Sequence, residues 1–217
     1  MTLSSLLSVH VGKVAPLGPE QVPSGFVKHS VRGPVAVKPL GLAGDEQADL
    51  SVHGGPEKAV YGYAASRYPA WQKEFPELAA ALTPGSMGEN LAITGMDERD
   101  VCVGDVHGIG SALLQVCQPR RPCFKLGLRF DEEHLPRAMI RNGFSGWYYR
   151  VLRPGALEQG NSVTLEHRPN PDFAFARLVE ILNHGNGTRE ELSRMAKMPE
   201  LASQWRTRAE AMLDRLR

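Results

Sequence analysis

The cysteine at position 123 stands in the segment best suited to chemistry. It closes the run Gln118-Pro119-Arg120-Arg121-Pro122-Cys123, and Lys125 follows shortly after. The two prolines prevent strand pairing and stiffen the backbone, so we expect the thiol to lie outside a sheet. Neighbouring cations favour the thiolate, which is the nucleophilic and metal-binding form of cysteine. The segment predicts a thiolate beside an anion site; the alternative is a small, buried, apolar cysteine.

A pair of glycines flanked by donors forms the second candidate segment. Gly54 and Gly55 allow backbone N–H groups to come close to a ligand. His53 and Lys58 flank them and can donate to a phosphate or a carbonyl oxygen. The segment therefore predicts part of a binding loop, and the alternative is a tight turn with a solvated lysine.

Two more glycine-containing stretches could contact a ligand. In Gly88-Glu89-Asn90 the glycine fits a loop of close approach, and the two polar side chains could hydrogen-bond the edge of a heterocycle. The alternative is a turn into the next strand. Asn142 and Gly143 follow an expected helix, where the alternative is a helix cap and nothing more.

The bulk composition limits the kinds of partner. The net charge is +1 over 217 residues, so no overall field attracts nucleic acid or an acidic membrane surface. Three cysteines fit neither a disulfide framework nor a four-cysteine zinc site, and Cys102 and Cys117 lie in apolar runs that predict burial. Neither a signal peptide nor an apolar stretch long enough to span a bilayer is visible. We therefore expect a cytoplasmic protein with no membrane or nucleic-acid partner.

Short strands are expected to position these segments. Alternating apolar runs separated by Gly- and Pro-rich turns predict strands over 6–14, 34–38, 91–94, 101–106, 112–117, 147–152 and 162–167. Helices are expected over 66–75 and 135–141. Many short strands with glycine corners favour a mainly β fold, a closed or nearly closed barrel with a few inserted helices.

The last part of the chain has a different character. From Asp172 onward the apolar spacing predicts a three-helix appendage, in which Thr188 and Glu191 form a capping box and Pro199 opens the last helix. We expect one domain over 1–170 and a second over 171–217. The second is too small to fold alone, so it should pack on the barrel or on another subunit.

Taken together, these motifs resemble the MOSC family, the domain found at the C-terminus of molybdenum-cofactor sulfurases, and within it the bacterial YiiM group. The similarity spans most of residues 6–167, and the helical tail is similar to the domain that follows in those proteins. The segments that carry it are 41–49, 52–61, 88–91, 103–106, 118–126 and 143–152. The resemblance implies a MOSC-type β-barrel that binds molybdenum cofactor, with Cys123 as metal ligand beside the two dithiolene sulfurs of the pterin.

The resemblance also implies reduction of N-hydroxylated compounds, including base analogues such as hydroxylaminopurine. We expect oxygen-atom transfer that yields an amine, with Cys123 at the metal and His53 as proton donor. A separate flavin-type reductase should supply the electrons, since the sequence shows no flavin or nicotinamide motif. The residues expected to bind the cofactor are Gly54, Gly55, Lys58, Gly88, Glu89, Asn90, Arg120, Arg121, Asn142 and Gly143.

Two other functions stay open at this point. A sulfur carrier would use the same reactive thiol as a Cys123 persulfide and need no molybdenum. A DNA-binding or sensor module would use the three helices as the reader, although the near-neutral charge argues against it. We expect the tail to serve either homodimerisation or docking of the reductase.

Overall fold

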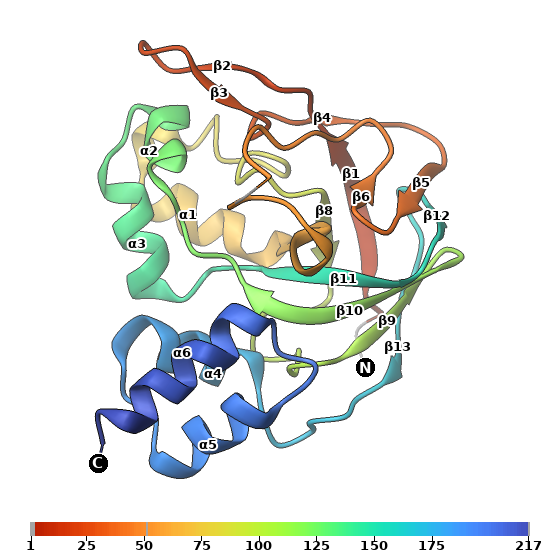
Figure 1. Cartoon of the computed structure of the whole chain (residues 1–217). Coiled ribbons are helices and arrows are strands. Elements are labelled where there is room, and N and C mark those ends of the chain that lie inside the picture. The colour runs from red at the N-terminus through yellow and green to blue at the C-terminus, as the bar shows by residue number, and fades with distance from the viewer. Residues whose placement is uncertain (1–2, 51, 217) are drawn as a thin grey trace.

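A large, strongly bent sheet forms the centre of the molecule in the computed structural model, which describes residues 3–50 and 52–216 (Figure 1). Eight strands follow the order β13-β9-β10-β11-β7-β8-β1-β4, and all neighbours are antiparallel except β7 and β8. The strands of this sheet are β1 Ser5–Val11, β4 His29–Ser30, β7 Val60–Ala64, β8 Leu91–Thr94, β9 Val106–Ile109, β10 Ala112–Pro119, β11 Trp147–Arg153 and β13 Val163–His167. The shorter strands β5 Val35–Lys38, β6 Gly41–Leu42 and β12 Gly155–Leu157 form a second sheet, and β2 Ala15–Leu17 pairs with β3 Val22–Ser24.

The sheet curls towards a barrel without closing. Strand β1 meets the region before β13 at one isolated bridge between Ser5 and Ser162, and Val163 N–H donates to the carbonyl of Ser4 over 2.8 Å. Further along, the same edge of β1 is occupied by β4, which pairs with it at His10. A continuous ladder between β1 and β13 is therefore blocked. The expected MOSC-type fold is confirmed, but the barrel stays open here and helices (30%) contribute as much as strands (28%).

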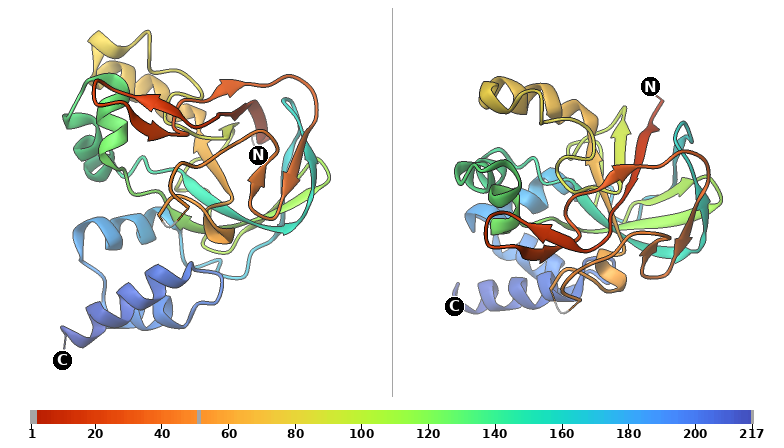
Figure 2. Two further views of the ribbon diagram at one scale, coloured as in Figure 1. Left: turned by 45° about the horizontal axis from the view of Figure 1, so that its top comes forward. Right: turned by 90° about the horizontal axis from the view of Figure 1, so that it is seen from above.

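Helices gather on one side of the sheet and below it (Figures 1 and 2). On the side lie α1 Tyr68–Glu74, α2 Phe124–Phe130 and α3 His134–Asn142, with the 3₁₀ turns η2 Ala65–Arg67 and η3 Pro76–Leu78. The turn η1 Pro56–Lys58 packs against β11 instead. The tail forms α4 Phe175–His184, α5 Arg189–Lys197 and α6 Ser203–Asp214. None of the helices in the described part of the chain is long and apolar enough to cross a membrane.

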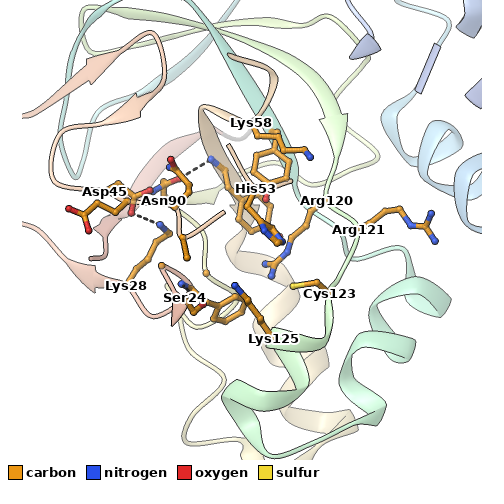
Figure 3. Close-up of a pocket in the computed structure, with 18 residues that line it drawn as sticks. Ser24, Lys28, Asp45, His53, Lys58, Asn90, Arg120, Arg121, Cys123 and Lys125 are labelled. Carbon is orange, nitrogen blue, oxygen red and sulfur yellow. Dashed lines mark hydrogen bonds and ion pairs between the residues drawn. The ribbon is translucent and has the colours of Figure 1, made fainter. Parts of the chain in front are cut away.

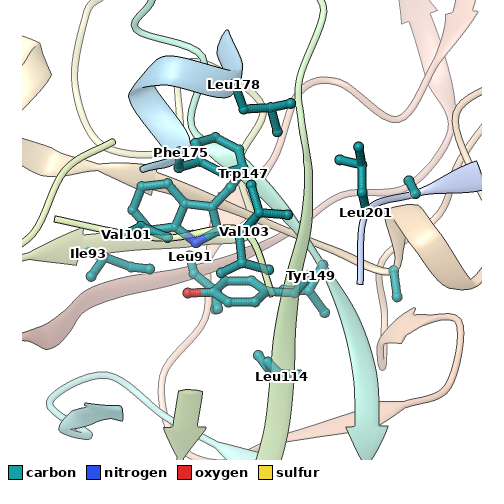
Figure 4. Close-up of a cluster of buried hydrophobic side chains, with 14 of the residues drawn as sticks. Leu91, Ile93, Val101, Val103, Leu114, Trp147, Tyr149, Phe175, Leu178 and Leu201 are labelled. Carbon is teal, nitrogen blue, oxygen red and sulfur yellow. The ribbon is translucent and has the colours of Figure 1, made fainter. Parts of the chain in front are cut away.

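The main hydrophobic core joins the sheet to the tail (Figure 4). Trp147 and Tyr149 on β11 are fully buried, and Phe175 and Leu178 of α4 pack into the same cluster. Each large apolar side chain buried in this way contributes about 1.5–3 kcal/mol. The tail therefore packs on the sheet, one of the two expected arrangements. The division into domains 1–170 and 171–217 stays a prediction.

Most predicted elements occur near their expected positions, but some differ, and the central strand β7 and several short strands were not predicted. The strand over 101–106 is wrong, because Asp105 accepts a hydrogen bond from the Cys102 N–H over 2.8 Å, forming a turn, and β9 begins only at Val106. Helix α6 begins at Ser203 instead of Pro199. Helix α2 was not predicted at all. The capping box of Thr188 and Glu191 at the start of α5 is confirmed.

Candidate functional site

An open pocket lies beside the ends of β10 and β11, and Cys123 forms part of its wall (Figure 3). The pocket is open to solvent, with a cavity volume of about 90 Å³. Its polar and charged lining residues include Ser24, Lys28, Asp45, His53, Lys58, Asn90, Arg120, Arg121, Cys123 and Lys125. Segments that are far apart in the sequence therefore meet here.

Cys123 occupies the position just before helix α2, where the chain has left the ladder after Pro119. The half-buried thiol points into the pocket (Figure 3). Burial opposes its ionisation, but a hydrogen bond with His53, the positive charge of Arg120 and the Lys125 N–H outweigh that effect and lower the pKa of Cys123 to about 7. A large share of the thiol is therefore ionised near neutral pH. By contrast, burial raises the pKa of Cys117 to about 12.

Arg120 supplies a fixed positive charge deep in the pocket. Its guanidinium is buried, donates to the carbonyl of Met87, and lies 4.9 Å from the Phe26 ring centroid and 5.0 Å from that of Tyr61. Within the described residues it forms no ion pair with a carboxylate. Its charge is thus available to an anion or to the thiolate.

A buried polar network holds the rim of the pocket together. Asp45 pairs with Lys28 and also accepts hydrogen bonds from Gly12 N–H over 2.8 Å and from Asn90 Nδ2 over 2.9 Å. The amide oxygen of Asn90 in turn accepts from the Tyr61 N–H over 3.0 Å. Asn90 lines the pocket, but its amide is committed to the protein and fixes β7 against the loop that carries Asp45.

Several predicted residues do lie around this pocket. Lys58 and Arg121 line it, and Lys58 donates to the carbonyl of Val52. Gly88 also lines it, at a φ of +79° where a Cβ atom would stand 3.1 Å from the Phe26 ring. All three were among the residues expected to bind the cofactor.

Gly54 and Gly55 contribute to the site indirectly. They form the turn between His53 and η1 and are not among the residues that line the pocket. Gly55 has a φ of +92°, which a residue with a side chain rarely adopts. The pair therefore positions its two functional neighbours.

Three residues expected to bind the cofactor lie elsewhere. Asn142 donates through Nδ2 to a Glu74 carboxylate oxygen over 2.7 Å, which joins α3 to α1, and Gly143 caps α3 at a φ of +69°. Glu89 is fully buried behind the pocket wall, where it accepts from the Tyr68 hydroxyl and the Gly85 N–H. None of the three lines the pocket, although all were expected to bind the cofactor.

Other pocket residues were missed by sequence reasoning. Lys28 and Asp45 form their pair across 17 positions, which no local pattern reveals. Tyr148 also lines the pocket, next to Tyr61 with ring centroids 5.0 Å apart. The available signal was the run of polar residues that follows Gly44, within one of the segments carrying the family resemblance.

The donor set fits a metal held mainly by its own cofactor. Among residues 3–50 and 52–216, no group of three or more His, Cys, Asp or Glu side chains could hold a metal ion. A metal here would take Cys123 as protein ligand and its remaining donors from the cofactor. A thiolate suits a high-valent molybdenum centre, and Arg120 and Lys125 suit a phosphate. The residues therefore fit molybdenum cofactor.

The chain belongs to the MOSC family, because the sequence model of the MOSC domain matches residues 49–164. MOSC domains are associated with binding of molybdopterin cofactor. The protein YiiM of Escherichia coli is 36% identical over 199 residues, which cover 92% of this chain and 88% of YiiM. The crystal structure of YiiM from Geobacillus stearothermophilus matches with a TM-score of 0.82 and 30% identity, over 97% of this chain and 99% of that one.

A longer relative carries the name of an activity. A protein of Gibberella moniliformis called "Reductase" is 36% identical over 197 residues, or 89% of this chain. The match covers only 35% of that protein. This chain therefore corresponds to about a third of its length.

Proposed function

We propose that this protein binds molybdenum cofactor in the pocket beside Cys123 and reduces N-hydroxylated substrates, such as hydroxylaminopurine-type base analogues, to amines. The overall change is R–NHOH + 2 e⁻ + 2 H⁺ → R–NH₂ + H₂O. When bound, the cofactor supplies the two-electron chemistry that accepts the hydroxyl oxygen. Membership of the MOSC family and the likeness to a protein named "Reductase" support an oxidoreductase.

One observation carries the proposal: a readily ionised thiol faces an open, cation-lined pocket. A cysteine with only a packing role would be sealed in the core with a raised pKa, as Cys117 is. Cys123 has instead a pKa lowered to about 7 by His53 and Arg120 against the effect of burial.

The protein's own residues would orient the cofactor and deliver a proton to the substrate. Cys123 would hold the metal, and Arg120, Lys125 and Lys58 would neutralise the phosphate of the pterin. His53, which hydrogen-bonds the thiol, stands at the pocket and can deliver a proton from its ring to the oxygen of the N–O bond. Tyr61 and Tyr148 form an aromatic part of the pocket wall, with ring centroids 5.0 Å apart.

The test combines metal content with turnover. Protein from a host that makes molybdenum cofactor should contain close to one molybdenum per chain, and with a chemical reductant under anaerobic conditions it should convert hydroxylaminopurine to adenine. Cys123→Ser should lose both the metal and the activity. Cys102→Ala, a change at a buried thiol outside the pocket, is the matched control and should keep both.

The sulfur-carrier alternative predicts the opposite result. Metal-free protein that carries a cyanolysable sulfur on Cys123, and that does not turn over the purine, would refute the reductase proposal.

We further propose that electrons come from a separate flavin-type reductase. The fungal relative supports this, since its match to this chain leaves most of its length for other modules. Titration of reduced flavoprotein into the loaded enzyme should restore turnover without a chemical reductant.

The three cysteines of the described chain are all free, which supports the predicted reducing, cytoplasmic location.

A further inference from the structure

A second cavity meets the first one at the thiol. This groove lies between the 118–123 loop and helix α6, with a cavity volume of about 410 Å³. It shares five lining residues with the first pocket, His53, Lys58, Arg121, Cys123 and Tyr148. Gln204 and Arg208 of α6 line the groove but not the first pocket. The sulfur therefore stands between two spaces, and the tail forms the wall of one of them.

The start of α6 is fixed to the site. Ser203 donates to the Glu57 carboxylate from its N–H over 3.1 Å and from its hydroxyl over 2.9 Å. Trp205 Nε1 donates to Gln118 Oε1 over 2.9 Å. These contacts hold the first turn of α6 against β10 and η1. Gln204 and Arg208 are four residues apart, so they share the face that meets the groove.

Three cations line the groove without a carboxylate partner in the described part of the chain. They are Lys58, Arg121 and Arg208. Arg208 lies 5.6 Å from the Trp205 ring centroid and donates to the carbonyl of Leu182 over 3.2 Å. Glu57, the acidic neighbour of Lys58, is already paired with Arg150 over 2.9 Å.

The positive charges also repel one another. Burial and then the proximity of Arg121 lower the pKa of Arg208. Figure 3 shows Arg121 pointing away from the first pocket, where Arg120 and Lys28 lie. A bound anion would relieve this repulsion, and two guanidinium groups are well suited to a phosphoryl group.

We propose that the groove binds the phosphate of an N-hydroxylated nucleotide, so that the substrate is a nucleoside 5′-phosphate instead of the free base. The first pocket would hold the cofactor, and the groove would place the base near Cys123 and the phosphate at Arg121 and Arg208. This assignment rests on the proposed function for its reaction, while the binding of the nucleotide can be measured without the cofactor. The pterin phosphate is the other source of the same chemistry, and Arg208 separates the two because it lines the groove but not the first pocket.

Binding to cofactor-free protein tests the proposal. We expect calorimetric titration with N6-hydroxy-2′-deoxyadenosine 5′-monophosphate to show at least tenfold tighter binding than with the unphosphorylated nucleoside. Arg208→Gln and Arg121→Gln should each weaken nucleotide binding about tenfold and leave nucleoside binding unchanged. Arg208→Lys should weaken nucleotide binding less than Arg208→Gln does. Lys197→Gln, which removes an equal charge from an exposed site on α5, is the control and should change nothing.

Three results would overturn the proposal. They are equal affinities for nucleotide and nucleoside, inorganic phosphate binding as tightly as the nucleotide, and an equal loss in Lys197→Gln. Arg121 is exposed on its loop, so its variant carries the test if Arg208→Gln proves unfolded by circular dichroism.

The cofactor-loaded enzyme separates this proposal from the proposed function. Arg208→Gln should retain its full molybdenum content, and a loss of metal would assign the groove to the pterin phosphate and refute the proposal. Reduction of free base and nucleotide at equal kcat/KM would refute the nucleotide assignment alone. Tight nucleotide binding without any reduction would refute the proposed function alone.

Discussion

Replacing Asp45 with asparagine should weaken the fold by removing the only negative charge paired with a buried lysine in the pocket rim. The two side chains of this pair are 2% and 7% exposed. Asp45 also accepts from Gly12 N–H and Asn90 Nδ2. In Asp45→Asn, the Lys28 ammonium keeps its charge in a site where burial already lowers its pKa. Arg120 stands close enough to add repulsion.

The expected cost follows from this burial. Removing one partner of a buried, hydrogen-bonded pair costs about 3–5 kcal/mol, because the other charge remains without compensation. Lys28→Met should also destabilise, since it leaves a buried carboxylate with neutral donors. The double variant removes both charges, so we expect its cost to fall below the sum of the single costs by about 2–3 kcal/mol.

Urea denaturation followed by circular dichroism measures these free energies of unfolding. The matched control is the neighbouring pair Lys13–Glu46, which has an N–O distance of 2.8 Å and exposures of 69% and 43%. Glu46→Gln should cost less than about 1 kcal/mol. The reasoning fails if Asp45→Asn costs no more than Glu46→Gln, or if the two changes at the buried pair are additive.

Three other perturbations test separate features. In cofactor-free protein, the rate of Cys123 alkylation by iodoacetamide should rise with a midpoint near pH 7, and His53→Asn should move that midpoint upward; mass spectrometry checks both. Burial raises the pKa of Glu89, so its contribution to stability is present below the unfolded pKa and is lost as pH rises through the folded one. Glu89→Gln should therefore flatten the fall in stability above about pH 4.5, as measured by denaturation across pH. Thr188→Ala removes half of a capping box and should cost about 1 kcal/mol, visible as a lower Tm.

Local patterns predicted the elements whose structure depends on neighbours in sequence. Strand β8 occupies its predicted residues, and the capping box of α5 was visible as Thr188 followed three residues later by Glu191. The strand predicted over 101–106 failed because an apolar run cannot reveal that Asp105 accepts a hydrogen bond from the Cys102 backbone. The open seam of the sheet was equally hidden, since it depends on β4 occupying the edge of β1.

The site predictions also depended on whether the deciding contacts are local in sequence. Cys123, Arg120 and Arg121 were identified because their chemistry is concentrated in one loop. Glu89 and Asn142 have equally suitable side chains, but each is hydrogen-bonded to a partner elsewhere, Tyr68 for the first and Glu74 for the second. Residue type alone therefore overestimates how many polar side chains remain available to a ligand.

One acidic residue, Glu57, forms contacts that connect the tail to the elements around the thiol. The Glu57 carboxylate accepts from Ser203 at the start of α6 and pairs with Arg150 on β11. The Glu57 carbonyl accepts from Gln118 Nε2 over 2.6 Å, and Gln118 lies in strand β10, which leads to the loop of Cys123. Glu57 also precedes Lys58 in η1. Because these contacts converge on a single residue, a shift of α6 would be transmitted to the Lys58 turn and to the loop of Cys123. The helical tail is thus coupled to the geometry of the site through hydrogen bonds, in addition to the core it shares with the sheet.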